Sequence, residues 1–311
     1  MVKKMLAVGV KKDGITSTYV FPWKVSIVAF MANPVFLKGE KVEETLTTLA
    51  KDPFFDLIEL GPLKPEHWRV VEKLAEETGV EFAMGAQPYV LMQGYNPSAT
   101  DEAKRREFVK KLKEVIDEIS SHGVYTVAFS SGPDPGPEKR DEARKALVQS
   151  LLEVTEYAKE KGVIVVLETF DRDWDKKQLI GPIAEAVEVA KQVRKEYSNF
   201  GLLWDLSHAP MLGEKPEDLK VAADYLVHIH IGCTKKVSDG SLKDWHPGFY
   251  RPGAINGVEE VEDLLRVLKE IGYDRAIGFE VKPEEGQLWL EVVNAAKGVL
   301  YTAFANYVAK W

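Results

Sequence analysis

Four residues with metal-binding side chains each stand near the end of a short apolar run. Glu168 ends VIVVLE, Asp205 ends GLLWD, His230 lies in LVHIHI and Glu280 follows AIGF. Three carboxylates and one imidazole make an oxygen-rich ligand set, which suits Mn²⁺, Mg²⁺ or Co²⁺ better than a soft metal, while Zn²⁺ also accepts it. We therefore expect one divalent metal ion, with Mn²⁺ favoured, if the fold brings these side chains together.

The four runs belong to a set of eight that are typical of buried parallel strands. Most are continuously apolar rather than alternating, as strands covered on both faces are. Charged segments with a helical period separate them, and the clearest, 101–123, places Phe108, Leu112 and Ile119 on one face. The eight predicted strands are 25–30, 55–60, 80–84, 126–130, 163–168, 201–205, 226–231 and 276–281.

Strand–helix alternation repeated eight times predicts an α/β protein with a single (β/α)8 TIM barrel. An open, doubly wound sheet is the alternative, because counting strands does not prove closure. No break in composition divides the chain, so we expect one domain over residues 1–311, with a barrel core of about 25–283 and a C-terminal helix of about 287–308. The other predicted helices are 66–79, 140–162, 182–197, 216–225 and 258–272.

A barrel determines where the polar ends of these runs lie. TIM-barrel active sites form at the carboxyl ends of the strands, and neighbouring strands are about 4.8 Å apart, so the four side chains can converge on one ion. His228 and His230 point to the same face, and His230, nearer the carboxyl end, is the expected ligand. Taken singly, each carboxylate could instead be a solvated or ion-paired loop residue. His246, in the long segment 233–257, could act as a lid residue, but the expected position is on the surface.

Composition and charge argue against several kinds of partner. The 311 residues hold 41 Lys and Arg against 49 Asp and Glu, and a net charge of −8 disfavours nucleic acid and anionic membranes. The single cysteine, Cys233, excludes an internal disulfide and a four-cysteine zinc site. The apolar run 5–10 is too short for a signal peptide or a membrane span. We expect a soluble cytoplasmic protein whose partner is a small molecule, with no nucleic acid and no membrane.

In addition, the chain resembles the xylose isomerase-like barrel superfamily, in particular its ketose 3-epimerase and sugar phosphate isomerase/epimerase branch. The resemblance is carried by the Asp-x-x-His pattern of Asp205 and His208, the His-x-His pattern of the seventh strand, the PGAI stretch at 252–255 and the closing stretch IGYDRAIGFEVKP. It is strongest from residue 163 to residue 283. The resemblance implies a metal site made of Glu168, Asp205, His230 and Glu280.

The same resemblance implies a mechanism and an assembly. Glu168 and Glu280 would flank the substrate, one removing a carbon-bound proton beside a ketone and the other returning a proton to the enediolate. Return on the opposite face gives an epimer, and return to the neighbouring carbon gives an aldose–ketose isomer. His208 would bind substrate oxygens, and a homo-oligomer, either a dimer or a tetramer, is expected.

Some positions depart from the ketose 3-epimerase pattern and affect the expected substrate. Trp174 stands where an acidic residue follows the first metal-binding Glu, and Lys236 stands where an Arg follows the strand-seven His. An Asn-Arg pair is replaced by Asp and Arg172. Lys236 and Arg172 are therefore candidates for binding a sugar acid or another anionic carbohydrate, with solvated loop charges as the alternative. Glu59, which ends the second run, is a further substrate-binding candidate or a partner of a neighbouring charge.

Other activities remain open for the same site. A keto-inositol dehydratase would begin with the same proton removal. The endonuclease branch, with a trinuclear zinc cluster, needs about twice as many ligands, and six histidines on a net acidic chain argue against it. A barrel that only binds sugar would be expected to have lost a ligand, and this chain keeps all four. We expect a metal-dependent epimerase or isomerase that acts on a ketose or a keto-sugar acid.

Overall fold

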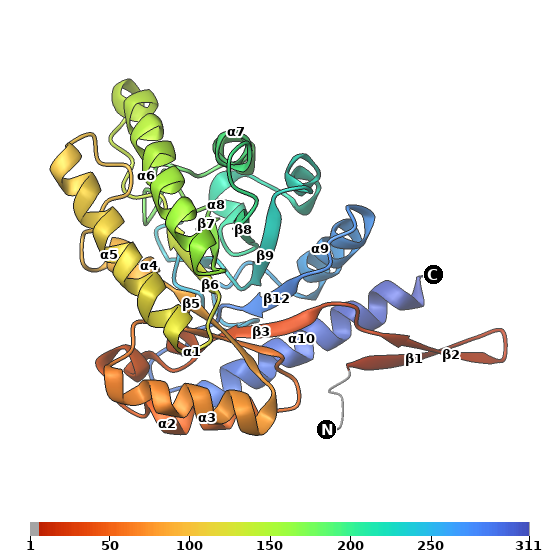
Figure 1. Ribbon diagram of the computed structural model, residues 1–311. Coiled ribbons are helices and arrows are strands. Elements are labelled where there is room, and N and C mark those ends of the chain that lie inside the picture. The colour runs from red at the N-terminus through yellow and green to blue at the C-terminus, as the bar shows by residue number, and fades with distance from the viewer. Residues whose placement is uncertain (1–5, 311) are drawn as a thin grey trace.

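The eight expected strands close into a parallel barrel. The structure is a computed structural model that describes residues 6–310. Each barrel strand pairs in parallel with two neighbours, which confirms the TIM barrel and excludes the open sheet (Figure 1). Around the barrel the order is β3 (Lys24–Val28), β4 (Leu57–Leu60), β5 (Glu81–Gly85), β6 (Thr126–Ser130), β7 (Ile164–Glu168), β8 (Phe200–Asp205), β9 (Leu226–Ile231) and β12 (Ala276–Phe279).

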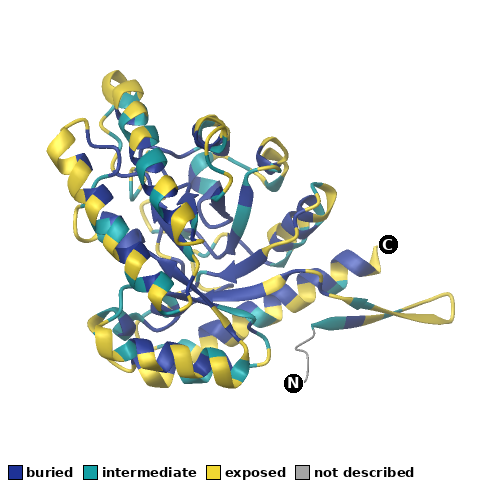
Figure 2. Ribbon diagram, viewed as in Figure 1, coloured by how far each residue is buried: buried dark blue, intermediate teal, exposed yellow. Residues whose placement is uncertain are grey.

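Amphipathic helices cover the outside of the barrel and turn their apolar faces toward it (Figure 2). Helix α5 (Glu102–Ser121) shows how the sequence specifies one of them. The side chain of Asp101 accepts a hydrogen bond from the backbone N–H of Ala103 at 2.9 Å and so caps the first turn. Phe108 and Ile119 lie on the buried face. The helix predicted at 101–123 is thereby confirmed.

The remaining helices agree with most of the predicted segments. The longer ones are α2 (Val42–Lys51), α3 (Trp68–Thr78), α6 (Arg140–Glu160), α7 (Ile183–Arg194), α9 (Val258–Glu270) and α10 (Trp289–Ala309). Short helices that follow barrel strands are α1 (Ala29–Ala32), α4 (Gln87–Leu91) and α8 (Ala209–Leu212). The 3₁₀ helices are η1 (Pro34–Lys38), η2 (Pro65–His67), η3 (Pro137–Lys139) and η4 (Pro216–Ala222).

The helix predicted at 216–225 is wrong in type, because η4 is a 3₁₀ helix that stops at Ala222. A short segment that starts at a proline and is separated from β9 by only a three-residue turn has little length for regular α-helical turns. Helix α2 was not predicted from the sequence, although the segment is amphipathic. Within residues 6–310, no helix has the length and apolar content needed to cross a lipid bilayer.

An antiparallel hairpin of β1 (Ala7–Lys12) and β2 (Ile15–Val20) precedes the barrel and was also not predicted. Its turn residues, Asp13 and Gly14, have φ of +53° and +80°, the left-handed conformation that an Asp-Gly turn favours. Val8 is buried, and β1 lies against α10. The tip of the hairpin projects away from the barrel (Figure 1).

Candidate metal centre and active site

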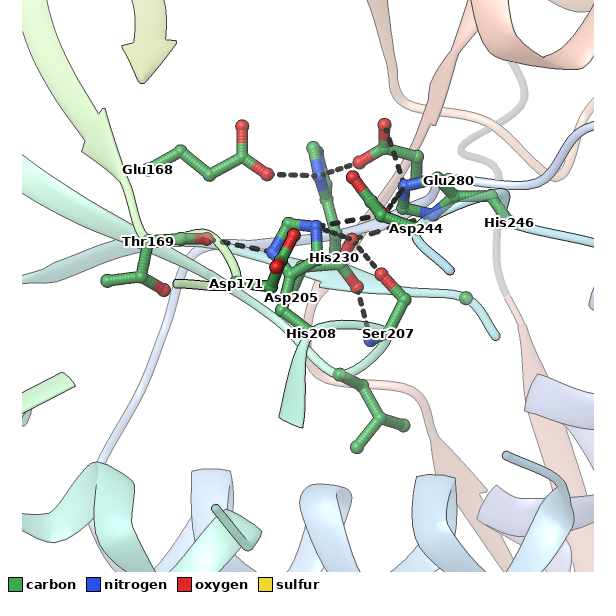
Figure 3. A network of polar contacts seen from close by, with 12 residues as sticks. Glu168, Thr169, Asp171, Asp205, Ser207, His208, His230, Asp244, His246 and Glu280 are labelled. Atoms are coloured by element: carbon green, nitrogen blue, oxygen red, sulfur yellow. Dashed lines mark hydrogen bonds and ion pairs between the residues drawn. The ribbon is translucent and has the colours of Figure 1, made fainter. Parts of the chain in front are cut away.

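The strand register brings the four candidate ligands together at the carboxyl ends of four adjacent strands of the barrel. Asp205 on β8 pairs directly with His230 on β9, and His230 pairs with Gly278 on β12, two residues before Glu280. Glu168 is the last residue of β7, next to β8. One ligand atom from each of the four lies within 4.8 Å of those of the other three. The convergence expected from the sequence is present, and Figure 3 shows the four side chains around one space.

The imidazole of His230 is held between carboxylates on both sides. Its Nδ1 lies 2.9 Å from Glu280 Oε2 and 3.9 Å from Glu168 Oε1, while its Nε2 lies 2.8 Å from Glu59 Oε2. Burial opposes the charged ring, but the charge of Glu59 and the hydrogen bond to Glu280 raise the pKa of His230 well above its usual range. A divalent cation at Nδ1 would satisfy the same carboxylates in place of that proton.

Several buried polar atoms around this space have no hydrogen-bond partner among the described residues. They include Oε1 of Glu168, Oε1 of Gln87 and Nδ1 of His246. The other oxygen of Glu168 accepts from Gln87 Nε2 at 2.6 Å, so the carboxylate is held in one orientation. Unsatisfied buried acceptors are rare in native proteins and call for a missing partner. Together with the oxygen-rich donor set, these atoms fit a divalent cation bound among the four ligands.

The pKa values of Glu168 and Glu280 are shifted in opposite directions. Burial, followed by the charge of Glu280, raises the pKa of Glu168 from 4.5 to about 8. Glu280 is half-buried, and desolvation opposes its charge, but the charge of His246 and the hydrogen bond from His230 lower its pKa to about 2. The pair therefore holds one carboxyl that can carry a proton and one that stays ionised, the arrangement that acid–base chemistry requires.

A second polar cluster adjoins the first and joins His208, which follows β8, to Asp244 and His246 of the loop after β9. His208 Nδ1 lies 2.8 Å from the carbonyl oxygen of Thr169, and its Nε2 lies 3.2 Å from Asp244 Oδ1 (Figure 3). His246 Nε2 lies 2.6 Å from the same Asp244 oxygen and 3.6 Å from Glu280 Oε1. Asp205, His208 and His246 also have ligand atoms close enough to hold a cation.

The surface position expected for His246 is wrong. Its side chain is 3% exposed and its backbone has φ of +49°, a conformation that non-glycine residues seldom adopt. Within this loop, β10 (Lys235–Lys236) and β11 (Leu242–Lys243) form a short ribbon that carries Asp244 and His246 inward. Sequence reasoning missed Asp244 altogether, although the Asp-x-His spacing in this segment was a signal for it.

A cavity of about 610 Å³ opens onto these groups. Polar side chains form one part of its surface: Glu59, Gln87, His230, Asp244, His246 and Glu280. Apolar and aromatic side chains form the wall: Val28, Phe30, Met31, Leu37, Leu91, Met92, Phe170 and Trp245. A cavity of this size with few polar groups on one side fits a small polyol, and Gln87 is a lining residue that the sequence did not suggest.

The other predicted substrate-binding residues divide into two groups. His208 lies beside the metal ligands and Glu59 lines the cavity. Lys236 and Arg172 are not among the lining side chains, for different reasons. Lys236 is exposed on β10, whereas Arg172 is bound by Glu185, with nitrogen–oxygen distances of 2.6 and 2.8 Å. The lysines that line the cavity are Lys38, Lys176 and Lys282.

Comparison with known proteins agrees with this architecture. The first curated relative is an inosose isomerase of Halalkalibacterium halodurans, 30% identical over 196 residues, which are 61% of this chain. The chain spans 65% of the length of that relative. A crystal structure of an IOLI protein with a bound zinc atom has a TM-score of 0.70, with 21% identity, and covers 91% of this chain and 99% of its own. A D-tagatose 3-epimerase-like protein has a TM-score of 0.68, with 19% identity, and covers 91% and 98%. The xylose isomerase-like TIM barrel family matches residues 48–298, and the chain belongs to that family.

Proposed function

We propose that this protein is a divalent-metal-dependent isomerase or epimerase that moves a proton on a carbon next to a ketone in a small polyhydroxylated substrate. The observation that carries the proposal is the convergence of Glu168, Asp205, His230 and Glu280 on one space beside the cavity. Glu168 and Glu280 are both ligand candidates and acid–base candidates, and their pKa values shift in opposite directions. These directions hold for the metal-free site, whereas a bound cation would keep both carboxylates ionised and in position.

When bound, the metal would withdraw electron density from the ketone and the adjacent hydroxyl, which lowers the cost of losing the carbon-bound proton. The ionised Glu280 removes that proton, because it lines the cavity directly. Glu168, whose carboxyl Gln87 holds in place, returns to the enediolate a proton that it takes up from solvent, and Glu280 releases its proton to solvent.

Of the two histidines joined through Asp244, His246 lines the cavity and has an Nδ1 without a partner among the described residues, so it is the candidate contact for substrate oxygens. His208 has both ring nitrogens bound, to Thr169 and Asp244, and so holds Asp244 in place. The apolar wall leaves few protein groups on that side of the cavity that could donate a proton to the enediolate.

The proposed substrates are ketoses, keto-sugar acids and inososes. Ketoses follow from the resemblance to the ketose 3-epimerases. Keto-sugar acids are kept because lysines line the cavity, although Lys236 and Arg172 do not. The inososes are added because the curated relative is an inosose isomerase. Mn²⁺ remains the proposed ion from the donor set, and Zn²⁺ stays a candidate because a structural neighbour binds zinc. We also propose that the protein forms a homo-oligomer and that it is located in the cytoplasm.

A dehydratase acting on a keto-inositol is the second candidate. The contact of His246 Nε2 with Glu280 Oε1, at 3.6 Å, favours it, because a proton donor beside the base could assist departure of a hydroxyl group after proton removal. Elimination and epimerisation would then share the first step and differ in the fate of the enediolate.

Exchange of the carbon-bound proton in D₂O tests the proposal. Protein loaded with Mn²⁺ is incubated with ketohexoses, keto-sugar acids and inososes, the metal is removed, and NMR measures loss of the C–H signal. We expect exchange with one class, its loss in Glu280→Gln, and its retention in the matched control Glu107→Gln on the outer surface of α5. A new C–H configuration in the product indicates epimerisation, and an unsaturated ketone indicates dehydration. Tight metal binding without exchange in any compound would refute the proposed activity.

A further inference from the structure

We propose that Glu59 is a positioning residue for the metal centre: its carboxylate holds Nε2 of His230 and so directs Nδ1 toward the metal. The inference rests on the proposed metal site. It replaces the substrate-binding role that the sequence suggested for Glu59. Both roles are compatible with a residue that lines the cavity, so the contacts of its two oxygens have to decide between them.

Both oxygens of Glu59 are already engaged by the protein. Oε2 lies 2.8 Å from Nε2 of His230, while Oε1 accepts from Ser26 Oγ at 2.7 Å and lies 2.8 Å from Nε2 of His228. The residue is 6% exposed. A carboxylate oxygen only accepts, so the Nε2 of His230 that faces it carries a hydrogen. The lone pair of a neutral ring is then on Nδ1, the nitrogen that faces Glu168 and Glu280.

The barrel leaves space for this contact at one level of its interior. Glu59 is on β4 and His230 is on β9, and the strands β12 and β3 lie between them. In register with His230, those two strands carry Gly278 and Ser26, which have small side chains. A Cβ atom on Gly278 would lie 2.6 Å from Glu59 Oε1 and 2.9 Å from Cδ2 of His230. Glycine at position 278 is therefore required for Glu59 to reach across to the histidine.

A hydrogen-bond acceptor behind a metal-binding histidine orients the ring, and removing it typically lowers metal affinity roughly tenfold to a hundredfold. Calorimetric titration with Mn²⁺ compares wild type with Glu59→Leu, which has no acceptor, and Glu59→Gln, which keeps an acceptor oxygen. We expect a loss in that range for Glu59→Leu and substantial rescue in Glu59→Gln. Gly278→Ala should resemble Glu59→Leu. Ser26→Ala, which removes a contact to the other oxygen, serves as the matched control and should stay near wild type.

NMR of Zn²⁺-loaded protein labelled with ¹⁵N-histidine gives a readout that loss of stability alone would not change. We expect a slowly exchanging Nε2–H signal of His230 in wild type and Glu59→Gln, and its loss or marked shift in Glu59→Leu. Unchanged metal affinity and an unchanged signal in both Glu59→Leu and Gly278→Ala, or a change in KM alone, would overturn the positioning role. Failure of the wild type to bind either metal would instead refute the proposed function.

Discussion

Replacement of Glu168 by glutamine should separate two effects of this carboxyl: the loss of folding stability caused by burying it, and its contribution to metal binding. The side chain is 1% exposed, and Oε2 accepts from Gln87 Nε2 at 2.6 Å. Glutamine keeps the length of the side chain and an acceptor oxygen for that bond, but it cannot ionise. Burial and the charge of Glu280 raise the pKa of Glu168 from 4.5 to about 8.

The magnitude follows from proton linkage. Because the folded-state pKa is raised, the stabilisation due to the bound proton is complete below pH 4.5 and is lost as the pH rises to about 8. At pH 7, which is about 2.5 units above the unfolded-state pKa, the carboxyl of the unfolded chain is ionised while that of the folded protein keeps its proton. Each of those units lowers the free energy of unfolding by about 1.4 kcal/mol. Glutamine avoids this loss. The free energy of unfolding of metal-free Glu168→Gln should therefore exceed that of wild type by about 3 kcal/mol at pH 7.

Urea denaturation in EDTA at pH 5 and pH 7 measures this difference, with Glu107→Gln as a control for the change in net charge at an exposed site. The gain should shrink to well under half at pH 5. Addition of Mn²⁺ should then stabilise wild type, by about 2.7 kcal/mol when the free ion is at a hundredfold its Kd, and should stabilise Glu168→Gln much less. A variant that is less stable than wild type at pH 7, or a gain that is equal at both pH values, would refute the reasoning.

Three further outcomes are expected. Burial raises the pKa of the Cys233 thiol to about 12, so Ellman's reagent at pH 8 should not label native protein and should label one thiol per chain in urea; fast native labelling would contradict this burial. Gly232→Ala should weaken Mn²⁺ binding, because the added Cβ would lie 2.3 Å from the backbone oxygen of Glu280 and 3.3 Å from His246 Nδ1. Titration calorimetry measures the Kd, and an unchanged value would contradict this expected displacement of Glu280. Phe279→Ala should lower the free energy of unfolding by about 3–5 kcal/mol, since the ring is fully buried among other aromatic rings, and a loss below 1 kcal/mol in urea would contradict that packing.

The positions of the four candidate ligands could be predicted because each lies within one residue of the carboxyl end of a strand. Once a barrel is assumed, parallel pairing determines which strand ends are neighbours, and an apolar run that ends in a charged residue marks the end of the strand. His228 illustrates the same regularity, since alternation predicts a deeper position on the same face. It lies below His230, on the other oxygen of Glu59.

Residues on loops could not be placed by the same reasoning. Asp244 and His246 reach the site through a short ribbon and an αL backbone, which depend on contacts with the rest of the protein and leave no periodicity. Arg172 has the right spacing from the metal glutamate, but spacing does not determine which carboxylate the side chain meets, and Glu185 binds it. The hairpin is different, because Asp13-Gly14 between alternating segments was a readable signal.

The two halves of the barrel carry different parts of the site. Strands β7, β8, β9 and β12 supply the candidate ligands, whereas much of the cavity wall comes from the segments after β3 and β5, through residues such as Phe30, Met31, Leu91 and Met92. Substitutions in those two segments can reshape the space offered to a substrate without touching a ligand. Selection for a new substrate could therefore proceed on one side of the barrel while the reaction chemistry on the other side is inherited unchanged.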